Sequence, residues 1–235
     1  APNLRTPAEG NGTFKGASLE LFSGAHLFVQ SANAEVGNLV LKSGRLVHGG
    51  DQGSTVNLSG DIKVVEPSFI FFDQNNATLE LSAAVSGDQL LSLSQTSPFR
   101  GKGLENGTVN LLGNNGGFIG GWEIQGITVK AASKNAFGAS DITLIDATLD
   151  PDSNLNMPDQ DLKLVGSLIQ IVLDQDMAFA TVSAGDFAFT DDRSINVKIR
   201  HSLVAMPKNN FKPRFDDPRV GYFAQTKYDM TTIED

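Results

Sequence analysis

Residues that commonly carry enzyme chemistry are scarce in this chain of 235 residues, which has no cysteine and three histidines. The absence of cysteine excludes a cysteine nucleophile, a thiolate zinc site and a disulfide framework. His26, His48 and His201 form no HExxH motif and no pair at helical spacing. We therefore expect no zinc site, no cofactor and no enzyme activity.

Carboxylates gather late in the sequence and are the next candidates for chemistry. Oxygen-rich turns can bind calcium, but the sequence has neither the EF-hand order nor a GGxGxD repeat. Solvated turn carboxylates are therefore the favoured interpretation. No acid pair for glycoside cleavage can be assigned, and the basic residues that could serve a polysaccharide-cleaving site are scattered. The residues concerned are Asp146, Asp150, Asp152, Asp159, Asp161, Asp174 and Asp176, with the bases Lys63, Arg100 and Lys102.

The glycine-rich run Gly113–Gly121 follows neither the phosphate-loop nor the dinucleotide-binding order, and predicts a wide turn. Trp122, the only tryptophan, comes directly after it. It is the one candidate ligand-binding residue, as an exposed platform for stacking on a sugar. A half-buried core residue is the favoured interpretation for a lone tryptophan, and the sugar platform is the weaker one. The run Phe69–Phe72 places aromatic side chains on both faces of a strand, for which core burial is favoured over an association surface.

Charge and hydropathy exclude two classes of partner. The formal net charge of -9 argues against a nucleic-acid binder. No apolar run approaches the length of a transmembrane helix. The chain begins with Ala1, which fits either cleavage of an export leader or a fragment boundary. Glycosylation sequons at Asn11, Asn57, Asn76 and Asn106 are close to the number expected by chance and carry no inference.

The elements that must position these residues are short strands. Apolar and polar residues alternate in Thr55–Leu58, Thr78–Leu81 and Thr108–Leu111, and turn-forming Gly, Asn, Ser and Asp separate these segments. No amphipathic helix of useful length is expected before Asp186.

One strand motif, a small residue or Thr followed by apolar–x–Leu, recurs at uneven intervals along the chain. Strands too short to bury a face alone, repeated at a spacing of about 20 residues, predict an all-β right-handed parallel β-helix, or β-solenoid, with a short irregular C-terminal appendage. A β-sandwich is the alternative. In a solenoid, His26 and His48 would stack as surface residues on neighbouring coils. The motif ends at Leu21, Leu41, Leu58, Leu81, Leu111, Leu144 and Leu164.

Composition changes sharply near Asp186. The whole net charge of -9 belongs to residues 1–185, and only Gly221 of the 24 glycines lies in residues 186–235. Such a change marks a module boundary. We predict a solenoid region at 1–189 and a cap or linker at 190–235, where three Xaa-Pro pairs interrupt regular structure.

The runs GNNGGFIGGWEIQGITVK (113–130) and NAFGASDITL (135–144) resemble the autotransporter-associated β-strand repeat of bacterial surface proteins. The resemblance extends over about residues 50–185. Here Trp122 replaces the usual Thr, and Ile127–Val129 replaces Gly-Thr-Leu. The resemblance implies an exported, repetitive β-structure that serves as a passenger or stalk.

The run RHSLVAMPKNNFKPRFDDPRVGYF (200–223) resembles a different family. It is similar to the segment upstream of the catalytic domain in large secreted bacterial zinc metalloproteases. Their HExxH motif is absent from this chain, so the resemblance implies a non-catalytic accessory segment.

Three functional hypotheses follow. The first is a non-enzymatic structural or adhesive β-solenoid, extracellular or on the bacterial cell surface, that self-associates end to end into fibres because open solenoid ends expose strand edges. The second is an accessory segment of a secreted zinc metalloprotease. The third is a solenoid that binds or cleaves polysaccharide, with Trp122 contacting a surface glycan.

Overall fold

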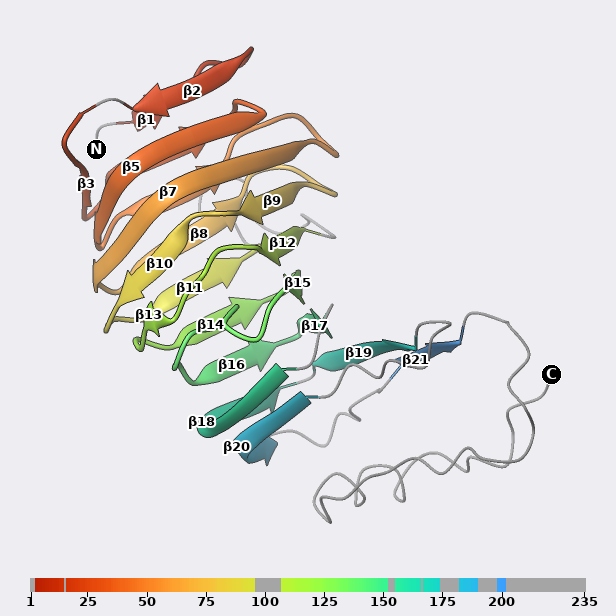
Figure 1. Ribbon diagram of the computed structural model, residues 1–235. Helices are drawn as coiled ribbons and strands as arrows, with labels where there is room; N and C mark the ends of the chain where they lie inside the picture. The colour runs from red at the N-terminus through yellow and green to blue at the C-terminus, as the bar shows by residue number, and fades with distance from the viewer. Residues whose placement is uncertain are drawn as a thin grey trace, which may run out of the picture. The chain divides into compact units, whose positions relative to one another are not determined.

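The computed structural model describes residues 3–14, 16–95, 107–151, 155–165, 167–173, 182–189 and 198–201. The described residues form strands and turns without a helix, and parallel strands stack in about six turns (Figure 1). The prediction of an all-β solenoid is therefore confirmed. The sandwich alternative is wrong, because its sheets would be antiparallel. The chain divides into two compact units, residues 1–201 and 202–235, of which the structure describes only the first.

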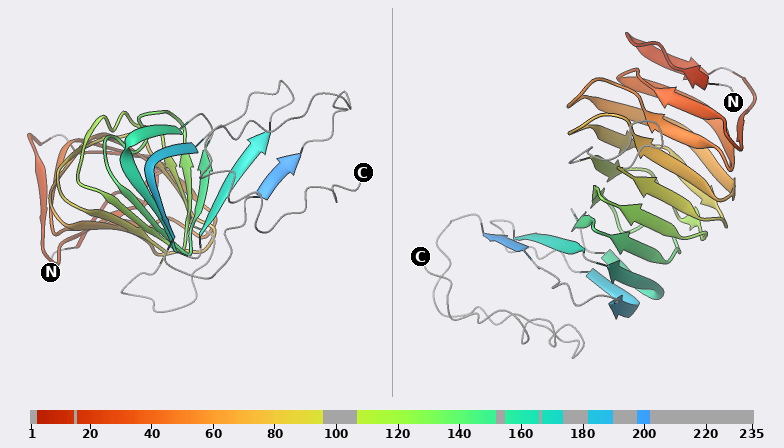
Figure 2. Two further views of the ribbon diagram at one scale, coloured as in Figure 1. Left: turned by 90° about the horizontal axis from the view of Figure 1, so that it is seen from below. Right: turned by 180° about the vertical axis from the view of Figure 1, so that it is seen from behind.

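Each coil contributes strands to two sheets that face each other across the interior. In the described residues, sheet 1 runs in the order β1 (Asn3–Arg5), β4 (His26–Val29), β6 (Arg45–His48), β8 (Ser68–Phe72), β11 (Leu91–Ser94), β14 (Trp122–Gln125), β16 (Ile142–Ile145), β18 (Leu155–Val165) and β20 (Val182–Phe189). Figure 2 shows the two sheets along the stack and from behind.

Sheet 2 runs in the order β13 (Gly117–Phe118), β10 (Ala84–Gly87), β7 (Thr55–Glu66), β9 (Thr78–Leu81), β12 (Thr108–Leu111), β15 (Thr128–Ala131), β17 (Thr148–Pro151), β19 (Leu168–Leu173) and β21 (Lys198–His201). Three more strands lie off this path, where β5 (Asn33–Lys42) pairs with β2 (Asn11–Phe14), β3 (Leu19–Phe22) and β7.

The alternating segments set the register of sheet 2. Thr55 of β7 pairs with Thr78 of β9, and the column continues through Thr108, Thr128 and Thr148. Because side chains alternate between faces, the residue after each Thr points inward. These inward residues are buried Val or Leu: Val56, Leu79, Val109, Val129 and Leu149.

The recurring Leu motif predicted stacking correctly, but its members occupy three columns rather than one. Leu21 and Leu41 pair in one half of sheet 2, and Leu58, Leu81 and Leu111 in the other. Leu144 and Leu164 pair in sheet 1. The sequence motif therefore marks an inward position on either sheet, and for this reason its intervals vary.

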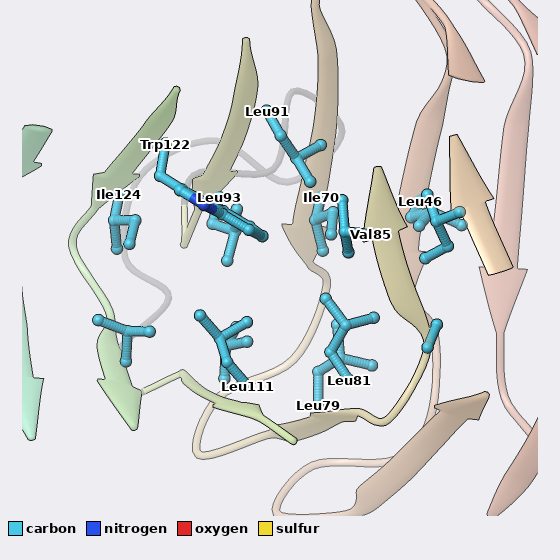
Figure 3. Packing of buried hydrophobic residues seen from close by; sticks show 14 of the residues in the cluster. Leu46, Ile70, Leu79, Leu81, Val85, Leu91, Leu93, Leu111, Trp122 and Ile124 are labelled. Atoms are coloured by element: carbon cyan, nitrogen blue, oxygen red, sulfur yellow. The ribbon is translucent and has the colours of Figure 1, made fainter. Parts of the chain in front are cut away.

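The core is one continuous apolar cluster between the sheets (Figure 3). In sheet 1, Leu46, Ile70, Leu93 and Ile124 occupy successive strands, and Leu81 and Leu111 lie opposite on sheet 2. Burying a side chain of this size stabilises a fold by about 1.5–3 kcal/mol. Each coil depends on its neighbours for that burial, which explains why short strands suffice.

The long strand β7 serves two partners, because β9 pairs with its first half and β10 with its second. Gly60 lies between the halves at φ 107°, a conformation that other residues rarely adopt. A Cβ at this position would overlap the Val36 carbonyl oxygen of β5. Glycine is therefore required where the sheet bends around the core.

The parallel ladder continues beyond the predicted boundary at Phe189. Strand β21 pairs with β19 between Gln170–Leu173 and Lys198–His201. The appendage expected after this point lies outside the described residues.

Candidate functional site

Trp122 begins β14 and points into the interior (Figure 3). Only 1% of its surface is exposed, and its indole Nε1–H donates to the Phe137 carbonyl oxygen at 2.9 Å. The rings of Phe118 and Phe137 meet it edge-on at centroid distances of 4.9 and 6.1 Å. The prediction of an exposed sugar platform is corrected, because no face of the indole is accessible to a ligand. Trp122 is a core residue.

The turn before Trp122 contains a polar group that sequence reasoning missed. Asn115 is fully buried, and its Oδ1 accepts from the Val85 backbone N–H at 2.8 Å. Its Nδ2 donates to the Ala136 carbonyl oxygen at 2.6 Å. The side chain thus joins three coils. The predicted wide turn Gly113–Gly121 also includes the short strand β13.

His26 and His48 lie on adjacent strands of sheet 1, but not in one column. His26 pairs in register with Arg45, whereas His48 pairs with Val29 on the opposite face. Both are buried, with 5% and 1% of their surfaces exposed. The expected ladder of surface histidines is therefore wrong. Their spacing in the sequence identified neighbouring coils but not the face, because the length of a coil varies along the stack.

Both ring nitrogens of His26 have hydrogen-bond partners on the outer face of sheet 1. Its Nδ1 lies 3.0 Å from Asn3 Oδ1 and its Nε2 lies 3.2 Å from Arg45 Nη1. A proton on Nδ1 and a lone pair on Nε2 fit both contacts, because a guanidinium can only donate. Burial and then the Arg45 charge lower the pKa of His26. The neutral ring is therefore a structural hydrogen-bonding group.

His48 faces the core without a hydrogen bond to either ring nitrogen from the described residues. Its ring stacks on Phe72 at a centroid distance of 5.7 Å and an interplanar angle of 16°. Burial is the main cause that lowers the pKa of His48, and backbone groups at His48, Ser54 and Thr78 and the Asp73 carboxylate partly oppose it. Nothing in the sequence distinguished this histidine from an exposed one.

The aromatic run of β8 divides between the two faces of sheet 1. Phe72 is fully buried in the core, and Phe69 and Phe71 stack on the outer face at 5.6 Å. Phe71 is nevertheless buried, and so are its outer-face register partners Val47 and Phe28. Core burial is correct for Phe72, while Phe69 and Phe71 form an outer apolar stripe.

The candidate carboxylates do not converge in the part of the chain that the structure describes. No three His, Cys, Asp or Glu residues there could share a metal ion. Asp150 lies 3.8 Å from Lys130, and Asp141 Oδ1 accepts from the Asp161 backbone N–H at 2.9 Å. Asp146 occupies a turn at φ 47°. Asp152, Asp174, Asp176, Arg100 and Lys102 lie outside the described residues, as do the side chains of Asp159 and His201.

The outer face of sheet 2 carries a polar column beside the Thr column. Asn11, Asn33 and Asn57 begin it, and Asn33 Nδ2 donates to Asn11 Oδ1 at 3.2 Å. The column continues through Glu80, Asn110, Lys130 and Asp150. Asn11 and Asn33 at one end of the column, and Lys130 and Asp150 at the other, interact along the stack, which favours a structural surface over a reactive centre.

Comparison with known proteins gives one partial match. The model of a family described as a domain of unknown function, DUF5117, matches residues 170–234. No curated protein and no solved structure matches the chain significantly. In the described residues, no helix is long and apolar enough to cross a membrane.

Proposed function

We propose that the chain is a non-enzymatic structural β-solenoid of an exported bacterial protein, acting as a stalk or spacer at the cell surface. The observation that carries the proposal is the pair of parallel sheets, which enclose a single apolar cluster. The buried polar groups Asn115 and Trp122 Nε1 are occupied by backbone bonds. The resemblance of residues 50–185 to surface-protein repeats supports export.

Surface exposure of the folded chain tests this proposal. Antibody binding and protease cleavage of the chain are compared between intact and permeabilised cells of its own bacterium. We expect both to occur on intact cells. Val129→Asp would place a carboxylate in the core, whereas Thr128→Asp places one on the outer face. We expect only the first variant to lose surface display. Display found only after permeabilisation would contradict the proposal.

End-to-end association is a further part of this proposal. Within the described residues, β1 pairs only with β4, and β2 and β3 only with β5, so none of these residues covers the outer edge of that coil. Leu4 is 44% exposed, although its register partner Leu27 is almost fully buried. Lysine blunts such edges, so Leu4→Lys should reduce fibre formation and Asn3→Lys, on the other face, should have less effect. A monodisperse wild-type monomer at high concentration in light scattering would contradict association.

A second candidate is an accessory segment of a secreted zinc metalloprotease. The resemblance of residues 200–223 lies wholly within the 170–234 family match, which supports a unit shared among proteins. An HExxH motif encoded downstream in the same gene would support this candidate, and a gene without one would contradict it. Casein hydrolysis by the purified chain with zinc, abolished by a chelator, would overturn the non-catalytic assignment.

A further inference from the structure

His48 is an ionisable group placed where the fold has no evident need for one. It occupies an inward column between Val29 of β4 and Phe72 of β8, and both partners are buried apolar residues. No hydrogen bond of good geometry reaches either ring nitrogen from the described residues, although backbone groups of His48, Ser54 and Thr78 act on the ring and favour its charged form. A buried, unsatisfied polar ring destabilises the folded state relative to an apolar ring of the same shape. The position therefore costs stability, and the cost rises if the ring becomes charged.

Two chain segments, residues 48–54 and 73–78, meet beside His48 at one corner of the coil. The His48 carbonyl oxygen accepts from the Asp73 backbone N–H at 3.2 Å, and the Ser54 carbonyl oxygen accepts from Thr78 N–H at 2.9 Å. These bonds tie the turn after β6 to the turn after β8. Because backbone groups of Ser54 and Thr78 act on the ring, a charged ring would lie close to the bonds that hold the corner together.

The charged groups around this corner offer incomplete compensation. Asp73, after β8, acts on the ring and favours its protonated form. Asp51 lies in the turn after β6, and its carbonyl accepts from Ser54. Glu80 of β9 and Arg45 of β6 belong to outward columns, the latter against His26. Strand β4 contributes the neutral Val29 at this level.

We propose that His48 makes this corner acid-labile, so that protonation of its ring opens the contact between residues 48–54 and 73–78. The pKa of His48 is lowered in the folded chain, so the unfolded or opened state takes up the proton first. The stability given by the neutral ring is complete above the ordinary pKa of about 6.5. It is lost as the pH falls from there towards the lowered value. The ratio of closed to open corner changes by up to about tenfold per pH unit in this window.

Thiol labelling tests local opening, because the native chain has no cysteine. Ala77→Cys places a probe at the corner, and Ala131→Cys places an equally buried probe in the distant β15. The rates are measured with a pyridyl disulfide at pH 7.5 and pH 5. The ratio of the two rates cancels the pH dependence of thiol reactivity. We expect this ratio to rise about tenfold at pH 5.

The same pair of probes in a His48→Phe background completes the test. Phe preserves the ring stack on Phe72 without a titratable nitrogen, and His48→Leu serves if Phe overpacks the corner. The ratio should then be the same at both pH values. His26→Gln is the matched control at the other buried histidine and should preserve the acid response. An equal rise at both probes, or a rise that persists without His48, would overturn the proposal.

Discussion

Replacement of Asn115 by alanine should destabilise the stack more than any other polar truncation in the glycine-rich turn. The change removes the acceptor for Val85 N–H and the donor to the Ala136 carbonyl oxygen. Each buried backbone group left unsatisfied costs about 1–3 kcal/mol. The loss is therefore about 2–6 kcal/mol, a large part of the roughly 5–15 kcal/mol that stabilises a typical domain.

The neighbouring Asn114 provides a matched control. Its Oδ1 accepts from Gly116 N–H at 3.2 Å and from Asn135 Nδ2 at 3.4 Å, but the residue is exposed. Water can replace both bonds, so Asn114→Ala should change the free energy of unfolding by about 0.5 kcal/mol or less.

The assay combines urea unfolding with native-state hydrogen exchange. Stacked coils need not unfold in one step, so a single midpoint would not locate the loss. Peptides that contain Val85 and Ala136 should exchange faster in Asn115→Ala, while peptides from β4 and β6 remain protected. An unchanged free energy of unfolding with unchanged exchange at Val85 would refute the reasoning that the two bonds of Asn115 hold these coils together.

Three further outcomes follow from the packing. Trp122→Ala should lower the free energy of unfolding, measured in urea, by about 3–5 kcal/mol because the indole is enclosed. A loss below about 1 kcal/mol would contradict its place in the core. Gly113→Ala should be strongly destabilising, since its Cβ would overlap the Ala83 carbonyl oxygen, whereas Gly37→Ala meets nothing within 4 Å and should be neutral in thermal unfolding. Lys130→Ala should lower the free energy of unfolding by less than about 1 kcal/mol at low salt, because the ion pair with Asp150 is partly exposed. A larger loss of stability that persists at high salt would contradict an ion pair screened by solvent.

The fold was predictable from the sequence because short alternating segments can bury a face only by stacking. Thr55–Leu58, Thr78–Leu81 and Thr108–Leu111 became neighbouring strands in register. Whether a side chain points into the core or to the surface was harder to predict. The number of residues between two positions does not reveal how many of them lie in turns. His48 was therefore expected at the surface and lies in the core.

The candidate site illustrates the same limit. An aromatic beside a glycine-rich turn fits either a ligand platform or a core residue, and only the burial of Trp122 between Phe118 and Phe137 distinguishes them. The sequence signal for Asn115 is that it is one of two adjacent amides in a glycine-rich turn. Recognising its role requires knowing that Val85 N–H and the Ala136 carbonyl lie within hydrogen-bond distance of this turn.

The uneven length of the coils has a consequence for how such a chain can change during evolution. Thr78 and Thr108 stay in register although the segment between them is longer than the segments that join Thr108 to Thr128 and Thr128 to Thr148. Doubling a loop costs only about 0.6 kcal/mol in closure entropy. Corners can therefore gain or lose residues with little effect on the ladder. The stack is thus a frame on which foreign segments could be grafted at a corner while every strand retains its neighbours.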